Sequence, residues 1–202
     1  MTRHNPLPLG ALAILLLAGS LPLAGCGPLV LGGAAAGVTV AAQDRPVRTA
    51  IDDSAIQGKI DKKLFEFDVE VFQQVDLEVV EGKVLLTGVV PEPQNRLDAA
   101  RLAWQVDGVA EVINEVEVKD TSSLSDAARD SWISAKLRSA ITFDREVRSI
   151  NYTIDTVNKT VYLMGIAQSQ DELDRVVGYA RQIDYVRRVV PYVRIKPPGE
   201  ES

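Results

Sequence analysis

An internal repeat constrains the fold of this 202-residue chain more than any other feature of its sequence. Shifted by 77 residues, the chain matches itself without a gap, and the matched positions are polar as well as apolar. The identical pairs are Asp53/Asp130, Ser54/Ser131, Ile56/Ile133, Lys59/Lys136, Val80/Val157, Val84/Val161, Leu86/Leu163, Gly88/Gly165, Ala103/Ala180, Asp107/Asp184, Val109/Val186, Val112/Val189 and Val116/Val193. The chain therefore holds two copies of one small domain.

Each copy has the same succession of hydrophobic periods: helical spacing, two alternating runs joined by a turn, a second helical stretch, and a Val-rich strand. In the first copy the carriers are Ile51, Ile56, Ile60 and Leu64, then Val75, Leu77 and Val79, the turn Glu81-Gly82, Val84 and Leu86, the helix with Leu97, Ala100, Ala103 and Trp104, and Val112, Val116 and Val118. This pattern predicts an αββαβ unit of the α+β class, with a three-stranded mixed sheet packed against two helices. Gly88 and Gly165 end the second strand of each copy and are predicted to serve backbone geometry or close packing.

The predicted domains are residues 47–118 and 124–196, joined by a polar linker at 119–123 and followed by a tail at 197–202. Before them, residues 1–25 have the basic start, the apolar stretch and the small residues of a signal peptide. Leu23-Ala24-Gly25-Cys26 resembles the lipobox of bacterial lipoproteins, in which the cysteine is acylated, with palmitate among the chains, and becomes the membrane anchor. A plain signal peptide with a chance cysteine, or an uncleaved membrane helix, are the alternatives.

Residues 26–46 would then form the acylated cysteine and a tether, which carries no charge from residue 27 to 43 and is either a spacer or a segment lying on the bilayer or a partner. By the lipoprotein sorting rule, Gly27 after the cysteine implies the outer membrane.

Several other functions are disfavoured by composition. A net charge of −6 argues against a nucleic-acid partner. One Cys and one His, both in the N-terminal segment, leave no triad or zinc site.

The chain resembles the BON domain family of small periplasmic αββαβ modules. The resemblance is carried by Lys83-Val84-Leu85-Leu86-Thr87-Gly88 and Thr160-Val161-Tyr162-Leu163-Met164-Gly165, followed by Val106-Asp107-Gly108-Val109 and Ile183-Asp184-Tyr185-Val186. It extends to the twin-BON outer-membrane lipoproteins associated with division and envelope stress. It implies a periplasm-facing protein that binds phospholipid and maintains envelope integrity, with no catalytic activity. We expect no cofactor and no metal. Tyr185 departs from the family pattern, where a glycine is usual, so a reshaped turn is expected there.

The two copies differ in charge and in the surface of their first helix. Residues 46–118 carry 7 Lys and Arg against 15 Asp and Glu, a balance of −8, whereas residues 119–202 carry 13 against 12, a balance of +1. An anionic bilayer therefore repels the first copy and tolerates the second. In the second copy Trp132, Lys136 and Phe143 form a stripe beside the apolar face, and the predicted lipid-binding residues are Trp132, Lys136, Leu137, Arg138 and Phe143.

Trp104, on the second helix of the first copy, is interpreted as a core or interdomain residue. The alternative to lipid binding is a scaffold that binds peptidoglycan, envelope assembly factors or division proteins through an apolar or acidic patch on the first copy. An enzyme with paired carboxylates is the weakest alternative, because two small copies offer no evident cleft. The acidic run Glu66, Asp68 and Glu70 is interpreted as a solvated face and not as a metal site.

Overall fold

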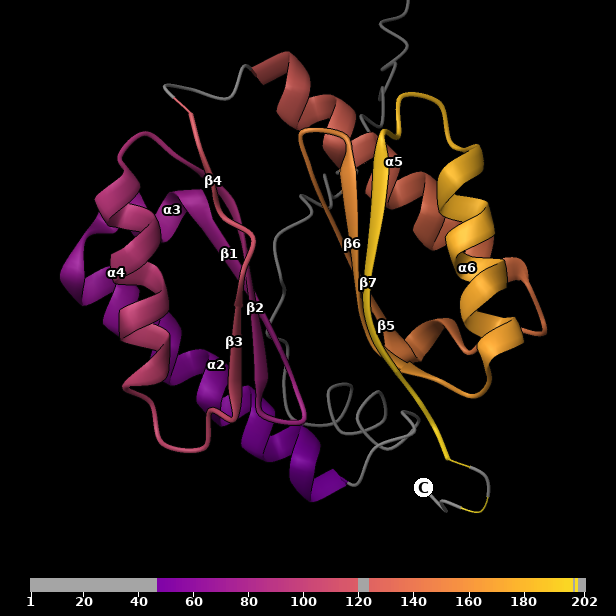
Figure 1. The fold of residues 1–202 in the computed structure, drawn as a ribbon, viewed down its shortest axis with the longest axis horizontal. Helices are drawn as coiled ribbons and strands as arrows, with labels where there is room; N and C mark the ends of the chain where they lie inside the picture. Colours follow the sequence, from indigo (N-terminus) through magenta and orange to yellow (C-terminus); the bar gives the residue numbers. More distant parts are fainter. Residues whose placement is uncertain (1–46, 120–123, 198, 200–202) are drawn as a thin grey trace, which may run out of the picture. The chain divides into compact units, whose positions relative to one another are not determined.

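The computed structural model describes residues 47–119, 124–197 and 199, and it contains two domains with the predicted αββαβ order (Figure 1). The first consists of α2 (Val47–Phe67), α3 (Val69–Gln74), β1 (Val75–Val80), β2 (Lys83–Val90), α4 (Pro93–Trp104), β3 (Glu111–Asn114) and β4 (Glu117–Val118). The second consists of α5 (Leu124–Phe143), the 3-10 turn η1 (Ser149–Asn151), β5 (Tyr152–Val157), β6 (Thr160–Ala167), α6 (Gln170–Gln182) and β7 (Arg188–Ile195). Both domains belong to one compact unit. The predicted signal segment, Cys26 and the tether lie outside the described residues.

Both sheets are mixed, as predicted, and have the second strand of the domain at their centre. β2 pairs antiparallel with β1 and parallel with β3, and β6 pairs antiparallel with β5 and parallel with β7. The helices α4 and α6 make the crossovers into the parallel strands. The α+β prediction is therefore confirmed in both copies.

A buried aspartate on the first helix of each domain explains one identity of the repeat. The two-residue hairpin turns Glu81-Gly82 and Asn158-Lys159 have positive φ at both positions, with values of 53°, 73°, 48° and 67°. Asp53 accepts hydrogen bonds from both N–H groups of the first turn, each at 2.8 Å. Asp130 accepts those of the second turn at 2.7 and 2.9 Å. The first helix of each domain thus fixes the hairpin turn through these two hydrogen bonds.

Gly88 and Gly165 lie where the backbone crosses closely over the central strand. Their φ angles are 115° and 143°, and a Cβ atom built on them would lie 2.1 Å from the carbonyl oxygen of Gln74 and 1.9 Å from that of Asn151. The prediction that the second strands end at these glycines is wrong, because the strands continue to Val90 and Ala167. The neighbouring strands β1 and β5 begin opposite the glycines, so the glycines mark the start of the partner strand.

The apolar faces of the helices build one core in each domain. Ile56, Ile60 and Leu64 are buried in the first, and Ile133, Leu137 and Ile141 in the second. Ile51, which was assigned to the same face as Ile56, is 59% exposed instead, because Ala50 occupies the buried position of that turn.

The prediction for Trp104 is wrong. Its side chain is 54% exposed and Leu97 is 61% exposed, whereas α4 buries Ala99, Leu102 and Ala103. Residues 99, 102 and 103 lie on one side of a helix, and residues 97 and 104 are turned away from it. The buried face of α4 is hard to recognise from the sequence, because two of its residues are small alanines and larger apolar residues lie on the exposed side.

The first domain departs from the simple αββαβ plan at two further points. A short helix, α3, precedes β1, and the Asp68 carboxylate caps it by accepting from the N–H groups of Glu70 and Val71 at 2.7 and 3.2 Å. Its last strand is split into β3 and β4, because the Asn114 side chain accepts from the N–H of Val116 and interrupts the ladder. In the second domain β7 is continuous.

The central strands are buried on both faces, which the repeat pattern had not indicated. Leu85, Val157, Tyr162 and Met164 form a third buried cluster that draws on both domains. Polar contacts flank it: Arg194 donates two hydrogen bonds of 2.8 Å to the Glu81 carboxylate, and the Asn158 amide donates to Glu117 at 2.7 Å. The apolar residues on the second face of the strands were the signal for this burial.

Candidate functional site

Two aromatic rings and two cations form a row on the surface of the second domain, which we call the aromatic–basic row: Arg129, Tyr185, Trp132 and Lys136. The Arg129 guanidinium lies 5.1 Å from the centre of the Tyr185 ring, and the Lys136 ammonium lies 5.8 Å from that of Trp132. The two rings meet edge to face at 6.3 Å. Trp132 is 43% exposed and Tyr185 is 62% exposed, so the rings remain open to a ligand.

The row is positioned by two elements. Helix α5 supplies Arg129, Trp132 and Lys136, which lie at spacings of three and four residues beside its buried face, and the turn between α6 and β7 supplies Tyr185. Next to the row lies a groove of about 330 Å³ between α5 and the end of α6. Its walls are formed by Trp132, Lys136, Ser139, Ala140, Tyr179, Gln182, Ile183 and Asp184.

The other predicted lipid-binding residues are placed differently. Phe143, the last residue of α5, is 84% exposed and lies along the same side of the helix as Lys136. Leu137 is fully buried in the core and does not belong to the exposed surface. Arg138 donates a hydrogen bond of 2.9 Å to the carbonyl oxygen of Tyr152, so its guanidinium is held at the strand. We therefore leave Leu137 and Arg138 out of the site.

Arg129 and Tyr185 were missed by the sequence analysis. The sequence pattern marks Tyr185 only as a replacement for glycine and predicts a reshaped turn there. The turn keeps its shape instead, with φ of 74° at Tyr185 and 98° at Gly108 of the first domain. A tyrosine in a position that favours glycine was the signal that could have found it.

The equivalent surface of the first domain lacks the row. A shift of 77 residues relates Arg129, Trp132, Lys136 and Tyr185 to Asp52, Ala55, Lys59 and Gly108. Only the lysine is kept, so both rings are absent and one cation is replaced by a carboxylate. The row is therefore a property of the second copy and not of the shared fold.

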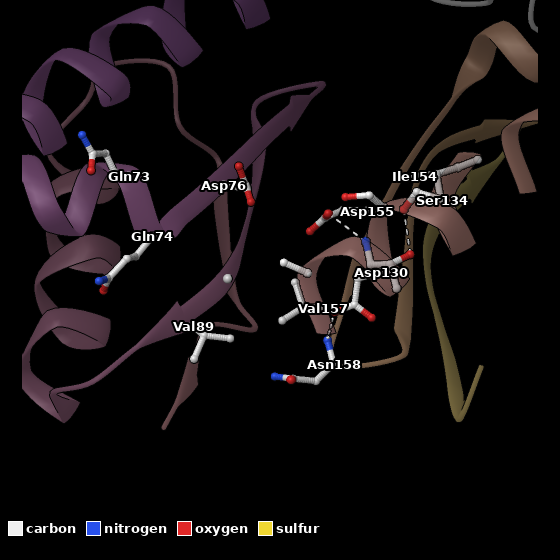
Figure 2. Close-up of a pocket in the computed structure, with 14 residues that line it drawn as sticks. Gln73, Gln74, Asp76, Val89, Asp130, Ser134, Ile154, Asp155, Val157 and Asn158 are labelled. Atoms are coloured by element: carbon white, nitrogen blue, oxygen red, sulfur yellow. Dashed lines mark hydrogen bonds between the residues drawn. The ribbon is translucent and has the colours of Figure 1, made fainter. Parts of the chain in front are cut away.

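A second, larger hollow lies between residues of both domains and is shown in Figure 2. Its volume is about 560 Å³, and the carboxylates of Asp76, Asp130 and Asp155 line it. Asp130 is held by the hairpin turn, while Asp155 accepts from the N–H of Thr156 at 2.8 Å. This carboxylate-lined hollow repels phosphate groups. Among the described residues, no three His, Cys, Asp or Glu side chains lie close enough together to hold a metal ion. It is the weaker candidate for a binding site.

Asp76 in this hollow gives a prediction for pH dependence. Partial desolvation in the hollow, together with the carboxylate of Asp155, raises the pKa of Asp76 above its usual value, although the residue as a whole is open to solvent. A carboxyl with a raised pKa contributes stability that is present below about pH 4 and is lost as the pH rises through the raised pKa. We expect Asp76→Asn to raise the melting temperature at pH 7 and to have less effect near pH 4. Asp76 is exposed, so solvent screening keeps the effect small. Equal shifts at both pH values in thermal melts would contradict the prediction.

No helix in residues 47–119 or 124–197 is long and apolar enough to cross a membrane.

The family is shown by comparison with known proteins. The BON domain model matches residues 52–120 and 129–197, and the chain belongs to the BON domain family. It is similar to the outer membrane lipoprotein DolP of Haemophilus influenzae, with 32% identity over 185 residues that cover 91% of this chain and 94% of that protein.

Two further relatives match about three quarters of the chain. A protein from Anaplasma centrale, described as an uncharacterized protein in the gshII 5' region, is 47% identical over 147 residues, which cover 72% of this chain and 96% of that protein. The osmotically-inducible protein Y of Escherichia coli is 27% identical over 156 residues, covering 76% and 78%. The sequence-based recognition of a twin-BON chain is confirmed.

Proposed function

We propose that this protein is an outer-membrane lipoprotein facing the periplasm, that its second BON domain binds anionic phospholipid, and that this binding helps to maintain the envelope. The observation that carries the proposal is the aromatic–basic row. Exposed rings beside cations are the composition of an interfacial anchor, because the ring enters the headgroup region while the cations attract lipid phosphates. The proposal contains no catalytic step.

The charge distribution supports binding through the second domain. Its part of the chain has a balance of +1 against −8 for the first, so an anionic surface repels the first domain and tolerates the second. Lys136 makes no ion pair with any described residue, which leaves its ammonium available to a lipid phosphate. Phe143 adds an exposed ring at the end of α5.

The anchoring part of the proposal rests on Cys26, outside the described residues. Its place in a lipobox-like segment supports acylation, and the name of the relative in Haemophilus influenzae supports an outer-membrane location. Two or three acyl chains give stable anchoring, whereas one gives marginal binding. The row would then orient an already anchored protein toward the lipid surface.

A scaffold function is the second candidate, and one observation favours it. The first domain exposes Phe67, Trp104 and Leu97, and the Arg101 guanidinium lies 5.9 Å from the ring centre of Phe67. Exposed aromatic residues on an acidic domain fit a protein partner or peptidoglycan better than an anionic membrane.

Flotation with vesicles tests the lipid proposal on the fragment 44–202, which lacks the anchor. We expect the fragment to float with vesicles that contain phosphatidylglycerol and not with pure phosphatidylcholine. Lys136→Glu replaces an attraction of about 1 kcal/mol by a repulsion of similar size, so the affinity should fall roughly 30-fold. Trp132→Ala should weaken binding as well, because it removes an interfacial ring.

Trp104→Ala is the matched control, since it removes a similarly exposed tryptophan from the first domain. It should leave flotation unchanged. Two results would contradict lipid binding by this surface: a wild-type fragment that stays in the bottom fraction, or two α5 variants that float as the wild type does. The scaffold function would then take its place.

A further inference from the structure

We infer that Tyr185 is a lipid-contacting residue, so that the membrane-binding surface is built from helix α5 together with the turn between α6 and β7. This inference rests on the proposed function and extends it to a residue outside the helix. The occupant is the headgroup region of an anionic phospholipid membrane, with the rings of Tyr185 and Trp132 in the interface and Arg129 and Lys136 directed to phosphates.

The backbone at Tyr185 is costly for a tyrosine. The residue has φ of 74°, and the N–H of Val186 donates to the carbonyl oxygen of Ile183 at 3.2 Å to close the turn. A turn with positive φ at its third residue favours glycine there, because a Cβ atom crowds the backbone. The first domain has Gly108 at this place, with φ of 98° and the equivalent bond from Val109 to Val106 at 3.3 Å.

The surroundings of the turn are also the same in both domains. The N–H of Arg187 donates to the carbonyl oxygen of Lys159 at 2.9 Å, and the N–H of Ala110 donates to that of Gly82 at 2.8 Å. The backbone has therefore not adapted to the larger residue. Tyr185 adopts a conformation that glycine adopts at less cost.

Packing in the hydrophobic core does not compensate for this strain. Tyr185 is 62% exposed and is not among the buried residues of the second core or those packed against it. Its described ring contacts are with Trp132 and Arg129, both on the surface. Strain held at an exposed residue is typical of functional sites, where the side chain is needed for something other than the fold.

The charges around the ring favour an anionic surface as the occupant. Arg129 shares Asp126 with Lys159, at 3.2 and 3.5 Å, so two cations face one carboxylate. Lys136 on the helix and Arg187, two residues after Tyr185, add positive charge. Asp184, the residue before Tyr185, is the neighbouring acidic group. The two rings lie between these cations, which is the arrangement that places aromatic groups at headgroup depth.

The test uses the full chain reconstituted into vesicles, with Trp104→Phe so that Trp132 is its only tryptophan. Quenching of Trp132 by brominated phosphatidylcholine is measured while the share of phosphatidylglycerol is raised. Tyr185→Gly should raise the melting temperature by about 2 to 4 °C, because the strain is removed. It should also weaken quenching, because the ratio of docked to undocked second domain falls about fivefold at a given share of phosphatidylglycerol.

Tyr185→Phe keeps the ring and should be quenched as the parent chain is. Quenching of Tyr185→Gly equal to that of the parent would overturn the inference while leaving the proposed function intact. A lower melting temperature of Tyr185→Gly would also overturn it, since Tyr185 would then serve the fold. A parent chain in which Trp132 is not quenched even with phosphatidylglycerol would overturn the proposed function itself, and Tyr185 with it.

Discussion

Gly165→Val is expected to unfold or severely destabilise the second domain. A Cβ atom at this position would lie 1.9 Å from the carbonyl oxygen of Asn151, which is backbone and cannot rotate away, and φ of 143° is strained for any residue with a side chain. Both effects act together, so the loss should exceed about 3 kcal/mol. Gly88→Val should do the same to the first domain, where the distance to the Gln74 oxygen is 2.1 Å.

Urea unfolding followed by circular dichroism measures this loss, and Gly178→Ala provides the control. Gly178 lies within α6 and has no atom within 4 Å of its Cβ position. An alanine there should stabilise the helix by roughly 0.5 to 1 kcal/mol. If Gly165→Val unfolds at the urea concentration of the wild type, the close crossing of the backbone is wrong.

Asp130→Ala is expected to be the second most damaging change. The buried carboxylate accepts two hydrogen bonds from the turn Asn158-Lys159, and without it both N–H groups lose their partner. Charge-assisted bonds of this kind contribute about 1.5 to 3 kcal/mol each. Burial raises the pKa of Asp130 in spite of the two bonds, so desolvation offsets part of this gain. We therefore expect a net loss of about 2 kcal/mol.

Urea unfolding also measures this loss, with Asp174→Ala as the control because Asp174 is exposed on α6. The control should change stability by less than about 0.5 kcal/mol. A loss for Asp130→Ala no greater than that of the control would show that the helix does not hold the hairpin.

The repeat made the fold predictable from the sequence, because each helix or strand had to agree with the hydrophobic pattern of both copies. Ile133 and its first-copy partner Ile56 are both buried, as the shared helical spacing predicts. The prediction for Trp104 failed because α4 has apolar residues on two sides: Ala99, Leu102 and Ala103 face the core, whereas Leu97 and Trp104 are exposed. Apolar spacing alone does not choose between such faces.

The site was accessible only in part. Trp132 and Lys136 were found because they are neighbours on one helix, and helical geometry is local. Tyr185 lies 53 positions further along the chain than Trp132 and joins the row through tertiary packing of a turn. Leu137 was wrongly placed on the surface, because an apolar residue next to basic residues fits the sequence pattern of a membrane-binding face and that of a buried helix face equally well. Burial, which the structure supplies, separates the two.

The emission maximum of Trp132 tests the lipid-binding surface most directly. In the fragment 44–202 with Trp104→Phe, all tryptophan emission comes from Trp132. Our account predicts a blue shift on adding phosphatidylglycerol vesicles and no shift with pure phosphatidylcholine, because the ring leaves water only at an anionic surface. The reciprocal fragment with Trp132→Phe, which reports Trp104, should not shift with either. A shift of Trp104 without one of Trp132 would contradict the account.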